Sequence, residues 1–172
     1  YFPYSDPGFE FPEAGDVWLD PAYGPNLQMQ SGQFGFSTLI HEIGHAIGLD
    51  HPFDDNGGEP ALPANMDNNQ YSIMSYDPHP TASVEAMSPM LLDILAIQHI
   101  YGANMNTRTG NDTYTFSNTK EELRAIWDAG GVDTFDCSNQ TLAVKIDLNA
   151  GAFSSIGRRN AGGAASNNIA IA

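Results

Sequence analysis

The sequence has few cysteines, few basic residues and no long apolar stretch, and each of these features argues against a class of protein. It contains one cysteine in 172 residues, which excludes an internal disulfide and favours a reducing compartment, unless bound calcium replaces disulfides as a cross-link. Lys and Arg total 6 against 21 Asp and Glu, so the net charge of −15 argues against nucleic acid or an anionic membrane as partner. No stretch is long and apolar enough to cross a membrane, and residues 1–10 show neither the basic nor the apolar region of a signal peptide.

The acidic composition has two interpretations. Acidic chains can simply be soluble ones, or part of the carboxylate set can be neutralised by bound Ca²⁺. Residues 21–40 and 161–172 carry little charge, which argues against a uniformly charged disordered chain. A length of 172 residues allows one modest domain or pieces of two. Cys137 lies at an apolar strand position and is assigned no chemistry.

Residues 41–51 contain the pattern H-E-x-x-H-x-x-G-x-x-H with every fixed residue in place. Residues four apart lie on one face of a helix, so His41 and His45 can direct their imidazoles at a single ion. Glu42 lies about 100° round the helix from His41, beside the metal, where a general base for an activated water should be.

The second half of this pattern predicts how a third ligand reaches the ion. His51 cannot share the face of a continuing helix, so the chain must leave the helix sharply, and Gly48 can take the left-handed conformation that ends it. Three neutral histidines and a water would complete a tetrahedral catalytic zinc site with one open position.

The same residues allow two alternatives to a catalytic zinc. One is an amphipathic core helix that happens to carry histidines, since apolar residues recur at helical spacing, but they should bury a different face (Phe36, Ile40, Ile43 and Ile47). The other is a structural zinc site, which favours four closed ligands, often cysteines, whereas this chain has only Cys137. The catalytic interpretation is preferred to both.

A second motif, Ser-Ile-Met-Ser-Tyr at residues 72–76, follows the zinc motif. With Pro52 directly after the third histidine and the segments described below, it makes the chain resemble the metzincins and, among them, the serralysins, which are secreted bacterial metalloproteases. The resemblance implies that Met74 forms the hydrophobic floor of the site. It also implies that Tyr76 is a fifth zinc ligand at rest and stabilises the tetrahedral intermediate when substrate binds, although a plain turn aromatic was the alternative.

Periodicity and turn residues predict the elements of the first part of the chain. Residues 1–4 and 16–19 are candidates for extended segments, and residues 33–47 for the zinc helix. A loop over residues 52–87 carries the Met-turn. A second helix is expected with Ser88 as N-cap, Pro89 at its first position and Gly102 at its end. His79 and His99 lack ligand spacing and are not assigned to a metal.

The character of the sequence changes after residue 106. Apolar residues at 142, 144, 146 and 148 alternate with more polar ones and predict a half-buried strand. Residues 132–137 and 168–171 are also expected to be extended. Residues 119–127 were ambiguous, because Thr119 and Glu122 form a capping-box pattern that favours a helix, whereas the resemblance favours a strand over residues 123–127.

Two Gly- and Asp-containing segments at residues 107–112 and 127–133 have the composition of a calcium site or of ordinary turns. The residues alone leave these alternatives nearly even, and the resemblance to serralysins favours calcium. It implies backbone carbonyl ligands in the first segment, and carboxylates with carbonyls in the second (Arg108, Gly110 and Asp112; Asp128, Gly130, Gly131 and Asp133).

The fold class expected is α+β. A metzincin or zincin-like catalytic domain at residues 1–106, with a partial N-terminal sheet, zinc helix, Met-turn and second helix, precedes the start of a β-rich calcium-binding β-roll or sandwich domain at residues 107–172. The calcium-binding repeat G-G-x-G-x-D-x-U-x is absent and few residues precede His41, so the chain is expected to be a piece of a longer protease. A companion piece of that protease or a small protein inhibitor is a possible partner.

The function predicted is a zinc-dependent endopeptidase of extracellular bacterial location, with Zn²⁺ as catalytic and Ca²⁺ as structural cofactor. Glu42 would take a proton from the zinc-activated water and pass it to the leaving amine, and Tyr76 would assist the oxyanion. The substrate would be an extended polypeptide paired with an edge strand upstream of the zinc helix. The alternatives are a catalytically inactive calcium-stabilised binding or secretion module, and another metzincin family such as the astacins.

Overall fold

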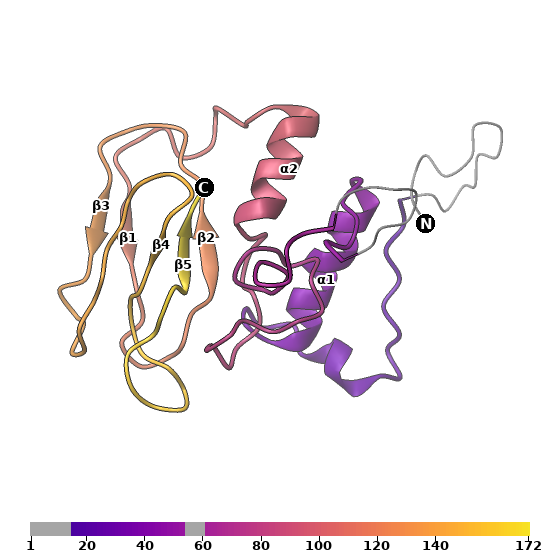
Figure 1. The fold of residues 1–172 in the computed structure, drawn as a ribbon, viewed down its shortest axis with the longest axis horizontal. Coiled ribbons are helices and arrows are strands. Elements are labelled where there is room, and N and C mark those ends of the chain that lie inside the picture. Colours follow the sequence, from indigo (N-terminus) through magenta and orange to yellow (C-terminus); the bar gives the residue numbers. More distant parts are fainter. Residues whose placement is uncertain (1–14, 54–60) are drawn as a thin grey trace.

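The structure, a computed structural model, describes residues 15–53 and 61–172. The extended candidate at residues 1–4 lies outside these residues. Helices come first in the chain and strands follow, so the α+β class is confirmed (Figure 1). The elements are η1 (Gly24–Leu27), α1 (Phe34–Ala46), α2 (Leu91–Tyr101), β1 (Thr113–Thr115), β2 (Arg124–Ile126), β3 (Thr134–Asp136), β4 (Phe153–Ser154) and β5 (Ile169–Ile171).

Helix α1 agrees with the helix predicted over residues 33–47. Gln33 is its extended N-cap and Ile47 its C-cap, after which Gly48 takes a φ of +100°. η1 packs closely against the start of α1, because a Cβ on Gly35 would lie 2.4 Å from the carbonyl oxygen of Asn26. The expected apolar stripe is only partly buried, since the Ile43 side chain is 44% exposed.

The predicted start of the second helix was wrong. Helix α2 begins at Leu91 with Met90 as N-cap, and the Asp93 carboxylate accepts the Met90 N–H at 2.7 Å. Asp93 therefore does the capping that was assigned to Ser88. The Ser88 hydroxyl instead accepts the N–H of Ala125 at 2.9 Å, which ties the helical part of the chain to the strands. Gly102 ends α2 as predicted, with a φ of +82°.

The strands form two small sheets. In the first, β1 and β3 pair in parallel, with Tyr114 opposite Phe135. In the second the order is β2-β5-β4, with β2 parallel and β4 antiparallel to β5. Strands β3, β5 and β2 confirm the extended segments expected near residues 132–137, 168–171 and 123–127, and no helix forms over residues 119–122.

Two predicted extended segments do not become strands. Residues 142–148 make only an isolated bridge, between Lys145 and Ser155, and their alternating apolar side chains stay 38–59% exposed (Leu142, Val144, Ile146 and Leu148). Alternation predicts a strand only when one face is buried, and no described layer covers this face. Residues 16–19 lie outside any strand, and the described residues before α1 contain no sheet.

Two buried clusters form the core. One lies under the helices (Leu49, Ile73, Met74, Ala86, Met90 and Leu123), and the other lies among the strands (Tyr114, Phe116, Ile126, Ile156 and Ile169). Leu123 joins the first cluster from the strand region, and its carbonyl accepts the N–H of Met87 at 2.8 Å. The two parts of the molecule are therefore packed together. No helix in the described residues has the length and apolar character needed to cross a bilayer.

Candidate metal centre

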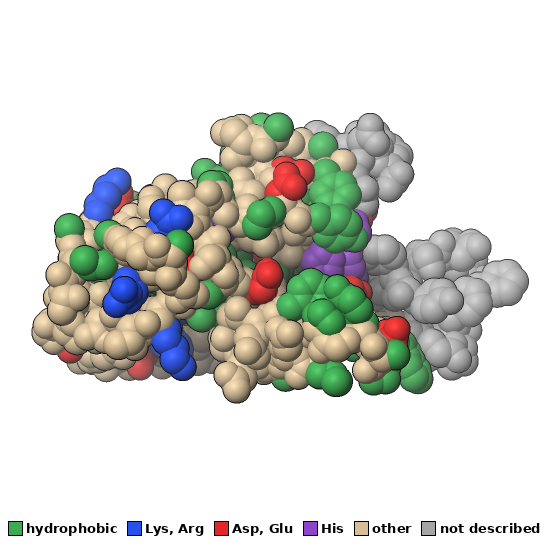
Figure 2. Space-filling view, turned by 90° about the horizontal axis from the view of Figure 1, so that it is seen from below, with side chains coloured by type: hydrophobic (Ala, Val, Ile, Leu, Met, Phe, Trp, Pro, Cys, Tyr) green, Lys and Arg blue, Asp and Glu red, His purple; other side chains and the backbone are tan. Residues whose placement is uncertain are grey.

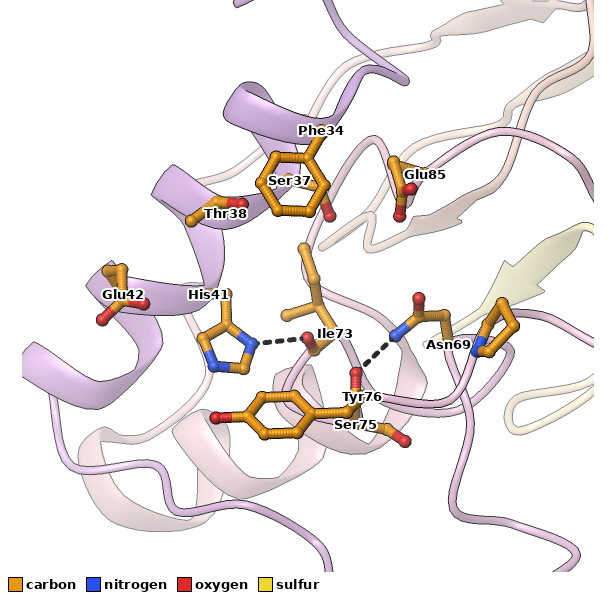
Figure 3. A pocket seen from close by; sticks show the side chains of 11 residues that line it. Phe34, Ser37, Thr38, His41, Glu42, Asn69, Ile73, Ser75, Tyr76 and Glu85 are labelled. Atoms are coloured by element: carbon orange, nitrogen blue, oxygen red, sulfur yellow. Dashed lines mark hydrogen bonds between the residues drawn. The ribbon is translucent and has the colours of Figure 1, made fainter. Parts of the chain in front are cut away.

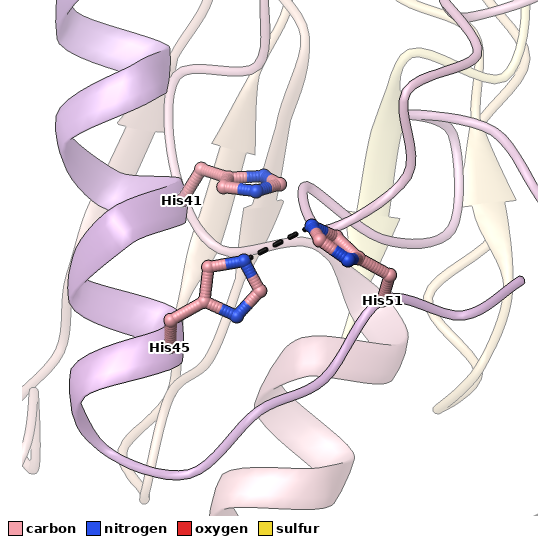
Figure 4. Close-up of side chains that lie close together, drawn as sticks. All are labelled: His41, His45 and His51. Atoms are coloured by element: carbon pink, nitrogen blue, oxygen red, sulfur yellow. Dashed lines mark hydrogen bonds between the residues drawn. The ribbon is translucent and has the colours of Figure 1, made fainter. Parts of the chain in front are cut away.

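Three histidines converge beside α1. His41 and His45 project from successive turns of the helix, and His51 reaches them from the chain that follows Gly48 (Figure 4). One ring nitrogen from each histidine lies within 4.8 Å of the others, and Nε2 of His45 is 3.0 Å from Nε2 of His51. The structure therefore brings together the three residues that the motif predicted as ligands.

Backbone carbonyls hold two of these rings in orientation. Nδ1 of His41 donates to the carbonyl of Ile73 at 2.9 Å, and Nδ1 of His45 donates to the carbonyl of Leu49 at 2.9 Å. With Nδ1 used in this way, Nε2 of each ring faces the site, which is the usual outer support of a metal-binding histidine. Burial also lowers the pKa of His41, which favours the neutral imidazole that a metal requires.

The donor set fits a zinc ion. Bonds of about 2.0–2.1 Å in a tetrahedral site put ligand nitrogens about 3.3 Å apart, close to the spacing of His45 and His51. The cluster contains three histidines and, in the described part of the chain, no fourth His, Cys, Asp or Glu. Three imidazoles with an open position are the donor set of a catalytic zinc, whereas structural sites close with four protein ligands.

Glu42 lies at the edge of the cluster. It lines a cavity of about 410 Å³ together with His41, and another of about 210 Å³ together with His45. The second cavity is also lined by Asp16 and Trp18, from the segment upstream of α1. Glu42 thus shares one cavity with His41 and another with His45, so it lies beside both histidines of α1.

The turn that contains Met74 (residues 72–76) packs against α1 and contacts His41. Met74 is 1% exposed, and Gly44 on α1 leaves room for it, because a Cβ at Gly44 would lie 2.5 Å from the Met74 sulfur. The Asp93 carboxylate accepts hydrogen bonds from the Ser72 hydroxyl at 2.6 Å and the Ile73 N–H at 2.7 Å. Asp93 therefore holds the turn whose Ile73 carbonyl orients His41.

Sequence reasoning missed two supports of this turn. Asp93 is 3% exposed, and its acidic position in the first turn of α2 was the available signal. Burial raises the pKa of Asp93, against the hydrogen bonds from Ser72, Ile73 and Met90 that favour the carboxylate. Asn69 donates from its amide to the carbonyls of Ser72 and Ser75, and no spacing pattern marked it.

Tyr76 lies over the histidines and is open to solvent. Its ring stacks on His41 with centroids 5.7 Å apart and contacts the ring of His51 at 4.7 Å. The side chain is 69% exposed, so most of its surface faces solvent. Phe53 stacks on His51 with an interplanar angle of 8°, a contact that the sequence did not indicate.

A second cluster joins the two Gly- and Asp-containing segments. Carboxylate oxygens of Asp112, Asp128 and Asp133 lie within 4.8 Å of one another. The backbones of the segments approach closely, because a Cβ at Gly131, where φ is +127°, would lie 1.8 Å from the Gly110 carbonyl oxygen. Carboxylates and carbonyls at such spacing are hard oxygen donors of the kind that Ca²⁺ prefers.

Contacts within this cluster show which atoms are already engaged. The Tyr114 hydroxyl donates to Asp128 and holds the pKa of that carboxyl below its usual value. The Asp112 carbonyl, expected from the resemblance as a ligand, accepts the Thr134 N–H at 2.8 Å. Arg108 takes a φ of +48° and places its guanidinium 5.0 Å from the centre of the Tyr114 ring.

Two histidines stay apart from both clusters, in agreement with the sequence. His99 is exposed on α2. His79 is 5% exposed, and its Nδ1 accepts the N–H groups of Thr81 and Ala82 at 3.1 and 2.9 Å. Its Nε2 lies 3.3 Å from the carbonyl of Asn167, so it joins the loop after the Met-turn to the strand region.

The sequence is similar to that of known bacterial metalloproteases. Residues 92–172 match the family described as Peptidase M10 serralysin C terminal. Serralysin from Proteus mirabilis is 40% identical over 168 residues, covering 84% of this chain and 34% of its own length. Serralysin A from Dickeya chrysanthemi is 40% identical over 161 residues, with the same coverage. Metallopeptidase AprA from Pseudomonas marginalis is 38% identical over 185 residues, covering 91% of this chain and 38% of its own length.

These matches confirm the resemblance: the chain is related to the serralysins, and its C-terminal part is of the serralysin C-terminal type. Similarity to the relatives covers 84% or more of the chain, so it extends upstream of residue 92. The chain spans about a third of the length of these relatives, so the activity of the whole proteins is a proposal for this chain.

Proposed function

We propose that this chain carries the zinc site of a serralysin-like endopeptidase that hydrolyses peptide bonds in proteins. The observation that carries the proposal is the convergence of His41, His45 and His51, with ligand nitrogens within 4.8 Å and Glu42 at the edge of the cluster. These three histidines would hold the zinc. Zn²⁺ in such a site acts as a Lewis acid on the carbonyl and makes a water molecule acidic enough to attack near neutral pH.

The side chains of this chain supply the proton transfers. The Glu42 carboxylate takes a proton from the attacking water and delivers it to the departing amine, which needs a base within hydrogen-bond reach of both groups. The hydroxyl of Tyr76 donates a hydrogen bond to the oxyanion as negative charge develops there. Tyr76 would also be a ligand of the zinc in the resting protein, and its exposed side chain has room to leave that position.

The substrate proposed is an extended polypeptide that pairs with the chain upstream of α1. Residues 16–18 line the cavity that Glu42 and His45 border, so this segment runs beside the site. No backbone hydrogen bond within the described residues engages residues 16–19. Extended backbone with unused N–H and C=O groups is what strand addition of a peptide requires.

The domains proposed around the site are those expected from the sequence. A metzincin catalytic domain at residues 1–106 would precede a calcium-stabilised β domain at residues 107–172. The calcium ligands proposed are the three carboxylates and the neighbouring carbonyls (Arg108, Gly110, Asp112, Asp128, Gly130, Gly131 and Asp133). The names of the relatives and their bacterial sources support a secreted extracellular protein.

Digestion of casein by wild type and by Glu42→Gln tests the proposal. Glu42→Gln should bind as much zinc as wild type, because all three histidines remain, but should lose at least about 100-fold in activity without its base. A zinc chelator should abolish wild-type activity. Elemental analysis of both proteins provides the control. Equal activity of the two proteins at equal zinc content would show that Glu42 is not the base, and no activity in zinc-loaded wild type would favour an inactive module.

A further inference from the structure

The charge of the sequence is divided between its two parts. All six Lys and Arg residues lie at position 108 or later, whereas 14 of the 21 Asp and Glu residues lie before it. Figure 2 shows the same division on one face, where the blue side chains lie over the strand-bearing part and none lies around the purple histidines. The cleft therefore lies in a part of the chain that has acidic but no basic side chains, which attracts positively charged ligands.

A cavity opens at the candidate zinc site on the side of His41. Its volume is about 410 Å³, within the range of about 300–1,000 Å³ that is usual for ligand pockets. The ring of Phe34 and the side chain of Ile73 give it apolar walls (Figure 3). Because His41 and Glu42 also line it, a side chain in this cavity belongs to a residue next to the bond that is cut.

Glu85 supplies charge at the far side of this cavity. Its carboxylate is directed into the space between Phe34, Ile73 and Asn69 (Figure 3). Its backbone is fixed, because its N–H donates to the Gly32 carbonyl at 3.1 Å. Among the described residues no hydrogen bond or ion pair engages the Glu85 carboxylate. A half-buried carboxylate facing a cavity is stabilised by a charged donor that enters it.

We propose that this cavity is the specificity pocket of the peptidase and takes an arginine or lysine side chain of the substrate, with Glu85 as its charged partner. The inference rests on the proposed function. The aliphatic stem of the side chain packs against Phe34 and Ile73, and the cationic end reaches Glu85. An acidic side chain is repelled there by both Glu85 and Glu42.

Cleavage of a matched peptide series tests this pocket. Internally quenched peptides of one sequence would carry Arg, its neutral isostere citrulline, Leu or Glu, at each of the two positions flanking the scissile bond in turn. At one of these positions, kcat/KM for Arg should exceed that for citrulline about tenfold or more, since a hydrogen bond between charged partners contributes more than a neutral one. Glu85→Gln should reduce this ratio towards one, and Glu85→Arg should favour the Glu peptide.

Asp136→Asn is the matched control, because it removes the same charge from β3 on the opposite side of the molecule. Its Arg-to-citrulline ratio should equal that of wild type. The proposal is overturned if wild type shows no preference for Arg at either position, or if Asp136→Asn lowers the ratio as much as Glu85→Gln.

Binding separates failure of the pocket from failure of the peptidase. Fluorescence anisotropy of the labelled Arg and citrulline peptides would be measured on zinc-loaded Glu42→Gln and on Glu42→Gln/Glu85→Gln. A preference for Arg that only the first protein shows supports the pocket even if wild type cuts nothing. Equal binding of both peptides by the first protein overturns it even if wild type is an active peptidase.

Discussion

At the scale of single residues, hydrogen bonds to a few backbone groups orient the histidine rings. The carbonyls of Ile73 and Leu49 accept hydrogen bonds from Nδ1 of His41 and His45, which turns Nε2 of each ring towards the histidine cluster. The Asp93 carboxylate accepts the N–H of Ile73, and the carbonyl of the same Ile73 accepts a hydrogen bond from His41. The buried Asp93 on α2 therefore influences the site through Ile73. Removing it would leave Ser72, Ile73 and Met90 with buried donors that lack their acceptor, a loss of about 1–3 kcal/mol for each unsatisfied group.

The sequence predicted which residues gather at the site better than it predicted the residues that support them. His41, Glu42, His45 and His51 stand at spacings that the helix period and Gly48 explain. The supports have no such spacing: Asp93 accepts from Ile73, 20 residues away, and Asn69 donates to carbonyls three and six residues ahead of it in a loop without a regular period. Glu85 was missed for the same reason, because its neighbours in the cavity come from α1 and from residues 69–78.

At the residue scale, the folded state should depend on pH through His79. Burial lowers its pKa below the usual 6.5, so the unfolded chain binds the proton more readily than the folded one. Its contribution to the free energy of unfolding is therefore complete above pH 6.5 and declines as pH falls from 6.5 towards the lowered pKa. In urea titrations at pH 8 and pH 5.5, wild type should lose more stability than His79→Asn. His99→Asn, at an exposed position, should follow wild type; equal losses in all three would contradict the account.

At the scale of elements, Gly48 determines whether the chain that leaves α1 can bring His51 to the other two histidines. It has a φ of +100° with no atom within 4 Å of where its Cβ would lie, so conformation alone requires glycine there. The turn also brings the Leu49 carbonyl back to His45. If α1 ended one residue later, His51 would be directed away from the other histidines, and the Leu49 carbonyl would be directed away from His45.

Gly48→Ala should therefore lower zinc affinity as well as stability. A side chain in the left-handed region costs about 1–2 kcal/mol, and relief of that strain would displace Leu49 and His51. Gly162→Ala is the control, since Gly162 has a similar φ of +95° and open space but lies in the strand-bearing part of the chain. Competition with a fluorescent zinc chelator should show weaker binding in Gly48→Ala only. Equal zinc affinity in both variants would show that the conformation at Gly48 does not affect metal binding.

Elements were predictable where local signals and packing agreed. The bounds of α1 were predicted to within a residue, because the apolar periodicity and the glycine that follows the helix indicate the same element. The start of α2 was not, because Asp93 caps it from inside the helix and the usual residue types do not stand at the N-cap. The strand predicted over residues 142–148 does not form. No layer of the described residues covers its alternating apolar side chains, and a sequence pattern does not show whether such a layer is present.

At the scale of the whole molecule, one apolar cluster crosses the predicted boundary near residue 106. Leu123 is fully buried among residues from the helical part, and Ser88 bonds to Ala125. The strand that carries these contacts, β2, lies next in the chain to the acidic segment at residues 127–133. A few residues therefore connect the proposed calcium site to the packing behind the three histidines.

Calcium should accordingly stabilise the whole chain. An ion that binds only the folded state raises the free energy of unfolding, by about 2.7 kcal/mol at 100 times its Kd. Thermal unfolding in Ca²⁺ should occur at a higher temperature than in EGTA for wild type, and the difference should vanish in Asp133→Asn. Asp147→Asn, which removes an acidic side chain outside the cluster, should keep it. A calcium-induced shift of equal size in both variants would mean that the ion binds elsewhere.

The central claim is that three imidazoles hold one zinc and leave a position open. X-ray absorption at the zinc edge of the loaded protein tests this most directly. The account predicts one zinc per chain, with nitrogen and oxygen neighbours at about 2.0–2.1 Å, three of them giving the scattering pattern of imidazole. Replacing His51 with Ala should remove one imidazole from that pattern. A sulfur neighbour, four imidazoles, or an unchanged spectrum in His51→Ala would contradict the account.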